Sequence, residues 1–194
     1  MGNVIANMSM SLDGFVAGPN DEVDHVFAWY EDGPVTVETE NPDFTVNISP
    51  ESAERFVPGT LAALICGRRL FDMTDAWGGR HPMGAHVFVV THSVPDGWPR
   101  EGAPFTFVHD GVDSAVRQAK ELAGDGDIAV ATPTITRQCL DLGLLDMIAV
   151  DLVPVILGAG VPFFSELAKA PVELETPSVT EAKGVTHLTY RVRR

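Results

Sequence analysis

The strongest chemical signal in the sequence is a glycine followed by two arginines. Gly67, Arg68 and Arg69 follow the apolar segment 61–66 (LAALIC), which is typical of a buried strand, and precede a segment that resembles a helix start. A turn from strand to helix presents unpaired backbone N–H groups and the positive end of the helix dipole, and the guanidinium groups add positive charge. This pattern predicts a phosphate site. A helix-start turn with solvated arginines explains it equally well.

Two further turns have the composition for close contact with a ligand. The turn 132–134 (TPT) stands between an expected strand and an expected helix, where it would hold a phosphate or simply cap the helix. The turn 158–160 (GAG) allows a ligand to approach the backbone, or forms a plain turn. No strand–GxGxxG–helix unit followed by an acid is present, so the sequence lacks the Rossmann fingerprint.

Asp13 is the candidate for acid–base chemistry. It lies in a glycine-flanked loop at the end of the first expected strand, where a carboxylate would act on a proton or bind a polar group of a substrate. A turn aspartate that binds its own backbone is the alternative. The six histidines show no zinc spacing, so no metal is predicted. No nucleophile elbow or serine-triad pattern occurs in the sequence.

Composition narrows the class of partner. Thirteen Lys and Arg residues against 27 Asp and Glu residues give a net charge of −14, which argues against nucleic acid and anionic membranes as partners. Cys66 and Cys139 lie in apolar stretches and are expected to be small buried hydrophobes, which suits a reducing compartment. With no signal-peptide pattern and no run of about 18 apolar residues, we expect a cytoplasmic protein.

Hydrophobic periodicity predicts the elements that would position these residues. Strands are predicted at 4–10, near 44–48, and at 61–66, 86–91, 105–109, 127–131, 147–153, 172–182 and 185–192. Helices are predicted at 23–30, 49–56, from 70 onward, at 111–123 and at 132–143. The segment 111–123 has the clearest helical period, and Gly124 is expected to end it.

The order of these elements predicts the architecture. Strands and helices alternate from 61 to 153, which favours a largely parallel sheet with helices on both faces. The last two strands are joined by a tight turn, which favours an antiparallel edge. We therefore expect one domain over residues 1–194, a three-layer α/β/α sandwich with a mixed, mostly parallel sheet. Sites in such sheets lie at the carboxyl ends of the parallel strands.

Four segments carry a resemblance to a known family. They are 8–18 (MSMSLDGFVAG), 65–72 (ICGRRLFD), 152–164 (LVPVILGAGVPFF) and 184–192 (GVTHLTYRV). In this order, and spread over nearly the whole chain, they resemble the dihydrofolate reductase-like proteins. The resemblance is greatest to the reductase domain of the bacterial bifunctional riboflavin biosynthesis protein and to its stand-alone relatives.

The resemblance implies a mixed sheet of about eight or nine strands, a homodimer, and hydride transfer from NADPH to a small heterocyclic, pterin- or pyrimidine-like molecule. It assigns cofactor contacts to three groups of residues, which are Ala6 with Gly14, Phe15 and Val16; Gly67, Arg68, Arg69, Thr91 and His92; and Ala131, Thr132, Pro133, Thr134 and Ile135. It places substrate contacts at Asp13, Trp29, Gly158, Gly160 and Phe163.

One turn departs from the family pattern. Where the family usually carries a glycine pair that lets the backbone approach the pyrophosphate, this chain has Ala131, Thr132 and Pro133. Alanine and threonine carry side chains, and proline removes an N–H donor. The sequence therefore leaves two functions open, an NADPH-dependent reductase and a non-catalytic small-molecule-binding protein on a reductase fold.

Overall fold

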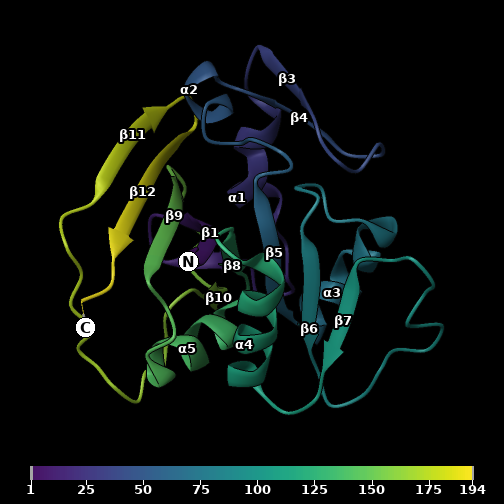
Figure 1. The fold of residues 1–194 in the computed structure, drawn as a ribbon. Helices are drawn as coiled ribbons and strands as arrows, with labels where there is room; N and C mark the ends of the chain where they lie inside the picture. Colours follow the sequence, from purple (N-terminus) through teal and green to yellow (C-terminus); the bar gives the residue numbers. More distant parts are fainter. Residues whose placement is uncertain (1, 194) are drawn as a thin grey trace.

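An eight-stranded sheet forms the centre of the computed structural model, which describes residues 2–193 (Figure 1). Its order is β11 (Ser178–Ala182), β12 (Val185–Arg191), β9 (Met147–Val153), β1 (Val4–Ser11), β8 (Asp127–Val130), β5 (Leu61–Gly67), β6 (His86–Val90) and β7 (Phe105–Val108). From β9 to β7 neighbouring strands pair in parallel, whereas β12 pairs antiparallel with β9 and with β11. The expected mixed sheet with an antiparallel carboxyl-terminal edge is confirmed.

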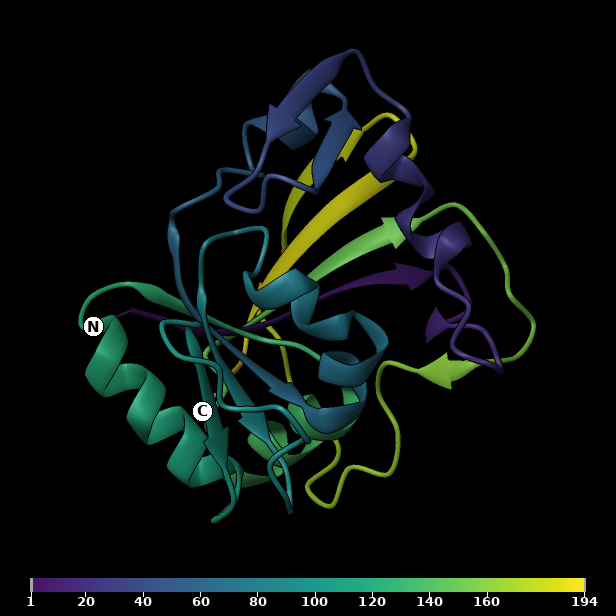
Figure 2. The same ribbon diagram turned by 90° about the vertical axis from the view of Figure 1, so that its right-hand side faces the viewer.

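Helices cover both faces of the sheet, as expected (Figure 2). They are α1 (Asp24–Phe27), α2 (Pro50–Ala53), α3 (Arg68–Met73), α4 (Val112–Ala123) and α5 (Pro133–Leu142), with 3-10 turns η1 (Ala28–Glu31) and η2 (Asp75–Gly79). Helices α4 and α5 pack together against β5 and β8, and α3 packs on β5 and β6 with a separate set of buried residues. Helix α4 ends at Gly124, whose φ of +57° lies in the range that glycine accepts readily.

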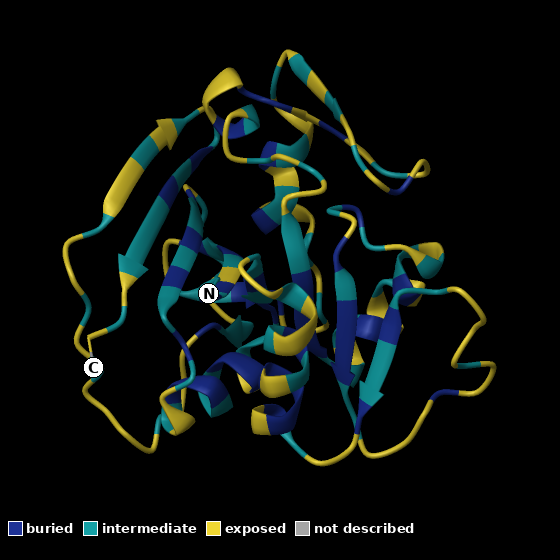
Figure 3. Ribbon diagram, viewed as in Figure 1, coloured by how far each residue is buried: buried dark blue, intermediate teal, exposed yellow. Residues whose placement is uncertain are grey.

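Buried and less buried residues alternate at the start of β1 and along β8, whereas β5 and β6 are buried in continuous runs (Figure 3). In β1, Val4 and Ala6 are buried under α4 and α5, while Asn7, one residue further on, is exposed. Successive strand residues point to opposite faces, so the apolar set is directed to one side. Each fully buried valine or isoleucine in such a core contributes about 1.5–3 kcal/mol.

Two small sheets lie outside the main one. Strand β2 (Phe15–Ala17) pairs with β10 (Val161–Pro162), and β3 (Val35–Glu38) pairs with β4 (Thr45–Ile48). The strand expected near 44–48 is confirmed as β4, whereas β2, β3 and β10 were not predicted. All three are short and lie outside the main sheet, so none contains a long run of alternating residues.

The strand predicted over 172–182 is wrong for its first half. Strand β11 begins only at Ser178, and before it a single bridge joins Leu174 to Val192. Pro171 and Pro177 flank the lost part, and a proline has no N–H to give to a sheet.

The two cysteines are buried, as predicted. Both thiols are free, and burial raises the pKa of Cys66 and of Cys139 to about 12, which keeps them in the neutral, unreactive form. Within residues 2–193 no helix combines the length and the apolar character needed to cross a membrane.

Candidate functional site

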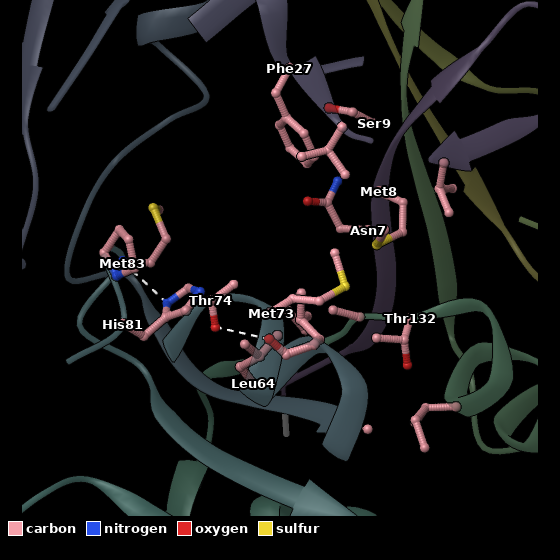
Figure 4. Close-up of a pocket in the computed structure, with 18 of the residues that line it drawn as sticks. Asn7, Met8, Ser9, Phe27, Leu64, Met73, Thr74, His81, Met83 and Thr132 are labelled. Atoms are coloured by element: carbon pink, nitrogen blue, oxygen red, sulfur yellow. Dashed lines mark hydrogen bonds between the residues drawn. The ribbon is translucent and has the colours of Figure 1, made fainter. Parts of the chain in front are cut away.

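A cleft of about 1630 Å³ lies on the sheet face that turns away from α4 and α5. Its floor is formed by alternate residues of neighbouring strands, which are Asn7, Ser9, Ala129, Ala149 and Asp151. Helix α1 with η1 forms one wall, and α3 with the segment up to Met83 forms the other. Figure 4 shows Phe27 on one side and Met73 and Thr74 on the other, with Asn7 between them. The cleft is large enough for more than one drug-sized ligand, since such ligands occupy roughly 300–1,000 Å³.

One end of the cleft, called here the arginine end, gathers the residues at the carboxyl ends of β5, β6 and β8. It is lined by Gly67, Arg68, Arg69, Thr91, His92, Ala131, Thr132, Pro133, Thr134 and Ile135. These turns lie far apart in the sequence. They meet because parallel strands bring their carboxyl ends to the same side of a sheet. The fold thus brings together ten of the residues that the resemblance assigned to cofactor contacts.

Arg68 joins two of these turns. Its Nε donates to both carboxylate oxygens of Asp72 at 2.8 Å, and its Nη1 donates to the Ser93 carbonyl at 3.3 Å. The Thr91 hydroxyl donates to the same carbonyl at 2.9 Å. The guanidinium therefore lies beside the loop that contains His92, in a position suited to an anionic group at that loop.

Arg69 points the other way and is paired with Asp21. Its Nε donates to Asp21 Oδ2 at 2.9 Å. Asp21 has a φ of +66°, which is uncommon for a residue other than glycine. Both side chains reach solvent, so the pair contributes little to stability, but it fastens the loop after β2 to the first turn of α3.

The turn at Thr132 has an unusual local geometry. Thr132 precedes α5 with a φ of +83°, and its hydroxyl does not cap the helix. The Oγ1 atom is buried and has no hydrogen-bond partner among residues 2–193. A β-branched residue in this conformation costs about 1–3 kcal/mol, and an unpaired buried hydroxyl adds to that cost. Such a combination is expected where a ligand compensates for it.

Asp13, predicted as a catalytic or substrate-binding residue, connects two loops in this structure. It does not line the cleft. Its Oδ1 accepts from the Ser11 hydroxyl at 2.7 Å and from the Leu157 N–H at 3.1 Å, and its Oδ2 accepts from the Gly158 N–H at 2.7 Å. The hydrogen bond from Ser11, followed by those from the two N–H groups, holds the pKa of Asp13 below its ordinary value. The carboxylate therefore fastens the loop 11–14 to the loop 156–158.

Several other predicted contacts are also absent from the cleft wall. Ala6 and Phe163 are buried in the core under α4 and α5, with exposed fractions of 0% and 1%. Gly14, Phe15, Gly158 and Gly160 lie in the paired loops around β2 and β10 and do not line the cleft. Of the residues predicted in these two loops, only Val16 lines it; Trp29, predicted as a substrate contact, does so from η1.

The end of the cleft opposite the arginines, called here the aromatic end, was largely missed by sequence reasoning. It is lined by Phe27, Trp29, Tyr30, Phe44 and Phe56, with Ser9, Ser52, Asp151 and His187 among them. The Trp29 indole N–H donates to the Ser9 hydroxyl at 3.1 Å, and the Trp29 ring lies edge-on to His187 at 5.3 Å. The available signal was a polar residue inside an otherwise apolar strand, as at Ser9 and Asp151.

No cluster of three or more histidine, cysteine, aspartate or glutamate side chains within residues 2–193 is arranged to hold a metal ion. The charged groups of the arginine end suit an anionic ligand instead, because arginine binds phosphate and carboxylate groups with planar, paired donors.

Comparison with known proteins gives relatives of the same fold. No family model matches the chain. The uncharacterized protein YyaP of Bacillus subtilis strain 168 is 24% identical over 202 residues, covering 96% of this chain and 93% of YyaP. A proposed riboflavin biosynthesis protein from Shewanella sp. PV-4 superposes with a TM-score of 0.69 at 21% identity, covering 99% of each chain.

Two further solved structures place the fold. Dihydrofolate reductase from Enterococcus faecalis, in complex with NADP(H), gives a TM-score of 0.60 at 16% identity over 100% of this chain and 98% of that chain. RibD from Acinetobacter baumannii gives 0.64 at 12% identity, with 100% of this chain covering 58% of RibD. The chain therefore has the dihydrofolate reductase-like fold, as the sequence resemblance predicted.

Proposed function

We propose that this protein is a reductase that binds NADPH at the arginine end of the cleft and reduces a small heterocyclic, pterin- or pyrimidine-like molecule at the aromatic end. The observation that carries the proposal is the single continuous cleft, with phosphate-suited turns at one end and an aromatic pocket with a few polar groups at the other. When bound, the nicotinamide supplies a hydride. The chain binds and orients the reactants and excludes water.

The residues at the arginine end fit the cofactor. A Cβ atom added at Gly67 would meet nothing closer than 3.6 Å, so space is left beside the turn. The buried, unpaired hydroxyl of Thr132 lies at the start of α5, where backbone N–H groups favour anions. Thr132 also keeps a backbone conformation that glycine adopts readily. The departure from the family's glycine pair thus changes the side chain while the shape of the turn remains compatible with a pyrophosphate.

The remaining parts of the proposal concern the state of the protein in the cell. A cytoplasmic homodimer that binds a small molecule, and neither nucleic acid nor membranes, is proposed from the composition and from the family resemblance. Light scattering of the purified protein tests the dimer, and a single species of 20.8 kDa would exclude it.

Arg68 lies beside the loop that contains His92, where it suits an anionic group. Because NADPH carries a 2′-phosphate that NADH lacks, this position predicts selectivity for NADPH over NADH. Calorimetric titration is expected to show preferential binding of NADPH. Replacing Arg68 by alanine is expected to weaken NADPH binding about 10- to 100-fold, since a charge-assisted contact is lost, and to leave NADH binding nearly unchanged. Arg100→Ala is the matched control, because Arg100 lies over the Trp98 ring at 4.5 Å and does not line the cleft. Failure of the wild-type protein to bind either cofactor would favour the non-catalytic binding protein.

The hydroxyl of Thr132 gives a second, independent test. Thr132→Val keeps the shape of the side chain and removes only the unpaired Oγ1 atom. If that atom binds the cofactor, NADPH and NADH affinity should both fall about tenfold, while the protein becomes no less stable to urea. Equal affinity of the variant and the wild-type protein for both cofactors would show that the Thr132 hydroxyl does not bind the cofactor.

A further inference from the structure

Three residues from distant parts of the chain form a continuous hydrogen-bonded row at the aromatic end. The Ser52 hydroxyl lies 2.9 Å from His187 Nε2, and His187 Nδ1 lies 2.7 Å from Asp151 Oδ1. Ser52 belongs to α2, His187 to β12 and Asp151 to β9, so the row exists only because the fold brings these elements together. All three residues border the cleft.

The burial of the three residues gives the row a direction. Ser52 is 1% exposed and the His187 side chain 3%, whereas the Asp151 side chain is 17% exposed. In a serine hydrolase the hydroxyl must reach the substrate. Here the hydroxyl lies at the buried end, and the carboxylate is the member that faces the cleft. The geometry therefore points to an Asp151 carboxylate whose orientation is fixed by hydrogen bonding to His187, which Ser52 holds in turn.

The surroundings of Asp151 leave one oxygen available. Among residues 2–193, His187 occupies Oδ1, and Oδ2 has only a long contact of 3.5 Å with the Asn7 amide. Tyr30 also lies close. Burial, and then the negative charge of Asp151, raises the pKa of the Tyr30 hydroxyl, which therefore stays protonated. Each carboxylate oxygen accepts two hydrogen bonds, so Asp151 retains capacity for donors that a ligand would bring.

The other charged groups that face this end come from the wall elements. Asp24 lies on α1, Glu31 on η1 and Arg55 just after α2, and all three line the cleft. The Arg55 guanidinium donates to the Thr189 hydroxyl at 3.1 Å. Asp24 and Glu31 are more exposed than Asp151. They add negative charge, and in the described part of the chain no hydrogen bond holds either carboxylate in place.

We propose that Asp151 is the substrate-binding carboxylate of the cleft, held in orientation by His187 and Ser52 as positioning residues. Its ligand is a nitrogen compound with two adjacent N–H donors, such as an amidine or an amino-substituted nitrogen heterocycle. A planar pair of donors can bind both oxygens of Asp151, one of which is shared with His187 while the other faces the cleft. This names the substrate chemistry of the proposed reductase and rests on that function, although the carboxylate site is testable without the cofactor.

The test uses benzamidine as probe and benzamide, its neutral analogue with one N–H₂ group, as reference. Both are titrated into the full chain by calorimetry. The ¹⁵N resonances of the His187 ring are followed in parallel because they report on the hydrogen bond to Asp151. The wild-type protein is expected to prefer benzamidine about 10- to 100-fold, with a change in the His187 resonances during the titration.

Three variants separate a specific site from general attraction to negative charge. Asp151→Asn keeps the size of the side chain and is expected to abolish the preference for benzamidine. Glu31→Gln removes a neighbouring, unbraced carboxylate and should leave the preference intact. His187→Gln retains a side-chain N–H donor and should reduce the preference only partly, as expected for a positioning residue. In all three, thermal unfolding checks the fold and NADPH affinity should be unchanged.

The outcomes distinguish this inference from the proposed function. If Asp151→Asn keeps the benzamidine preference, or if Glu31→Gln abolishes it, the assignment of Asp151 is overturned. Should Asp151→Asn fail to fold, unchanged His187 resonances in the wild-type protein at saturating benzamidine overturn it equally. A protein that selects benzamidine through Asp151 and binds no NADPH would refute the reductase and leave the carboxylate site standing.

Discussion

Replacing Gly160 by alanine is expected to lower the free energy of unfolding by about 3–4 kcal/mol. Gly160 has a φ of +154°, and a Cβ atom at this position would lie 2.0 Å from the Ala17 carbonyl oxygen. That contact is far below any van der Waals distance, and it falls on backbone atoms of β2. The two loops joined by β2 and β10 would have to separate to relieve it. Urea denaturation of the purified variant measures the loss.

Gly158 is the matched control for this substitution. It lies two residues earlier in the same loop with a φ of +77°, and a Cβ atom there would meet nothing within 4 Å. Gly158→Ala should therefore lower the free energy of unfolding by only about 1–2 kcal/mol, which is the cost of placing alanine in a left-handed backbone conformation. Equal losses for the two variants would show that the close packing of Gly160 against Ala17 is relieved at little cost, contrary to our expectation.

Acidification from pH 6.5 to pH 4 is expected to destabilise the protein through His81. Burial lowers the pKa of His81 to about 4. Its Nδ1 accepts from the Met83 N–H at 3.2 Å, and its ring lies edge-on to Trp77 at 4.8 Å. Below pH 6.5 the unfolded chain binds a proton at this histidine while the native protein does not. Stability is therefore complete above pH 6.5 and falls by about 3 kcal/mol as pH drops to the native pKa.

His81→Gln isolates this contribution. Other groups also titrate in this range: burial lowers the pKa of His86, and hydrogen bonding lowers that of Asp13. The measured quantity is therefore the difference between wild type and variant in urea unfolding at pH 7 and pH 4. The variant should lose about 3 kcal/mol less than the wild-type protein on acidification. Parallel curves for wild type and His81→Gln would contradict the assignment.

Local chemistry was readable from the sequence where neighbours in the chain determine structure. The start of the helix predicted over 49–56 is confirmed, and the Ser49 hydroxyl caps it by accepting from the Ser52 N–H at 3.3 Å. The helix 111–123 and its end at Gly124 follow from a period of apolar residues and one glycine. The turn Gly67-Arg68-Arg69 was found because a strand pattern meets a helix start. These signals are local, so they need no knowledge of the tertiary structure.

The contacts of Asp13 and Gly160 were decided by the fold. In the sequence, Asp13 is a loop carboxylate that suits catalysis or a turn, and Gly160 suits a ligand contact or a turn. The structure pairs their two loops, so that Asp13 accepts hydrogen bonds from the backbone N–H groups of Leu157 and Gly158, and Gly160 packs against Ala17. The Asp13–Gly158 hydrogen bond joins residues 145 positions apart. A periodic pattern in the sequence carries no information about contacts between residues so distant in the chain.

The sequence by itself thus determined the layered α/β architecture, the resemblance to a reductase fold and the arginine end of the cleft. Strand alternation and turn residues fix which side of each element is buried, and parallel strands bring their carboxyl ends together. The tertiary structure alone decided the aromatic end. Ser52, His187 and Asp151 meet because β12 returns beside β9 and α2 packs over that edge. Alternation shows which face a strand residue occupies, whereas its partners on that face depend on strand order and register.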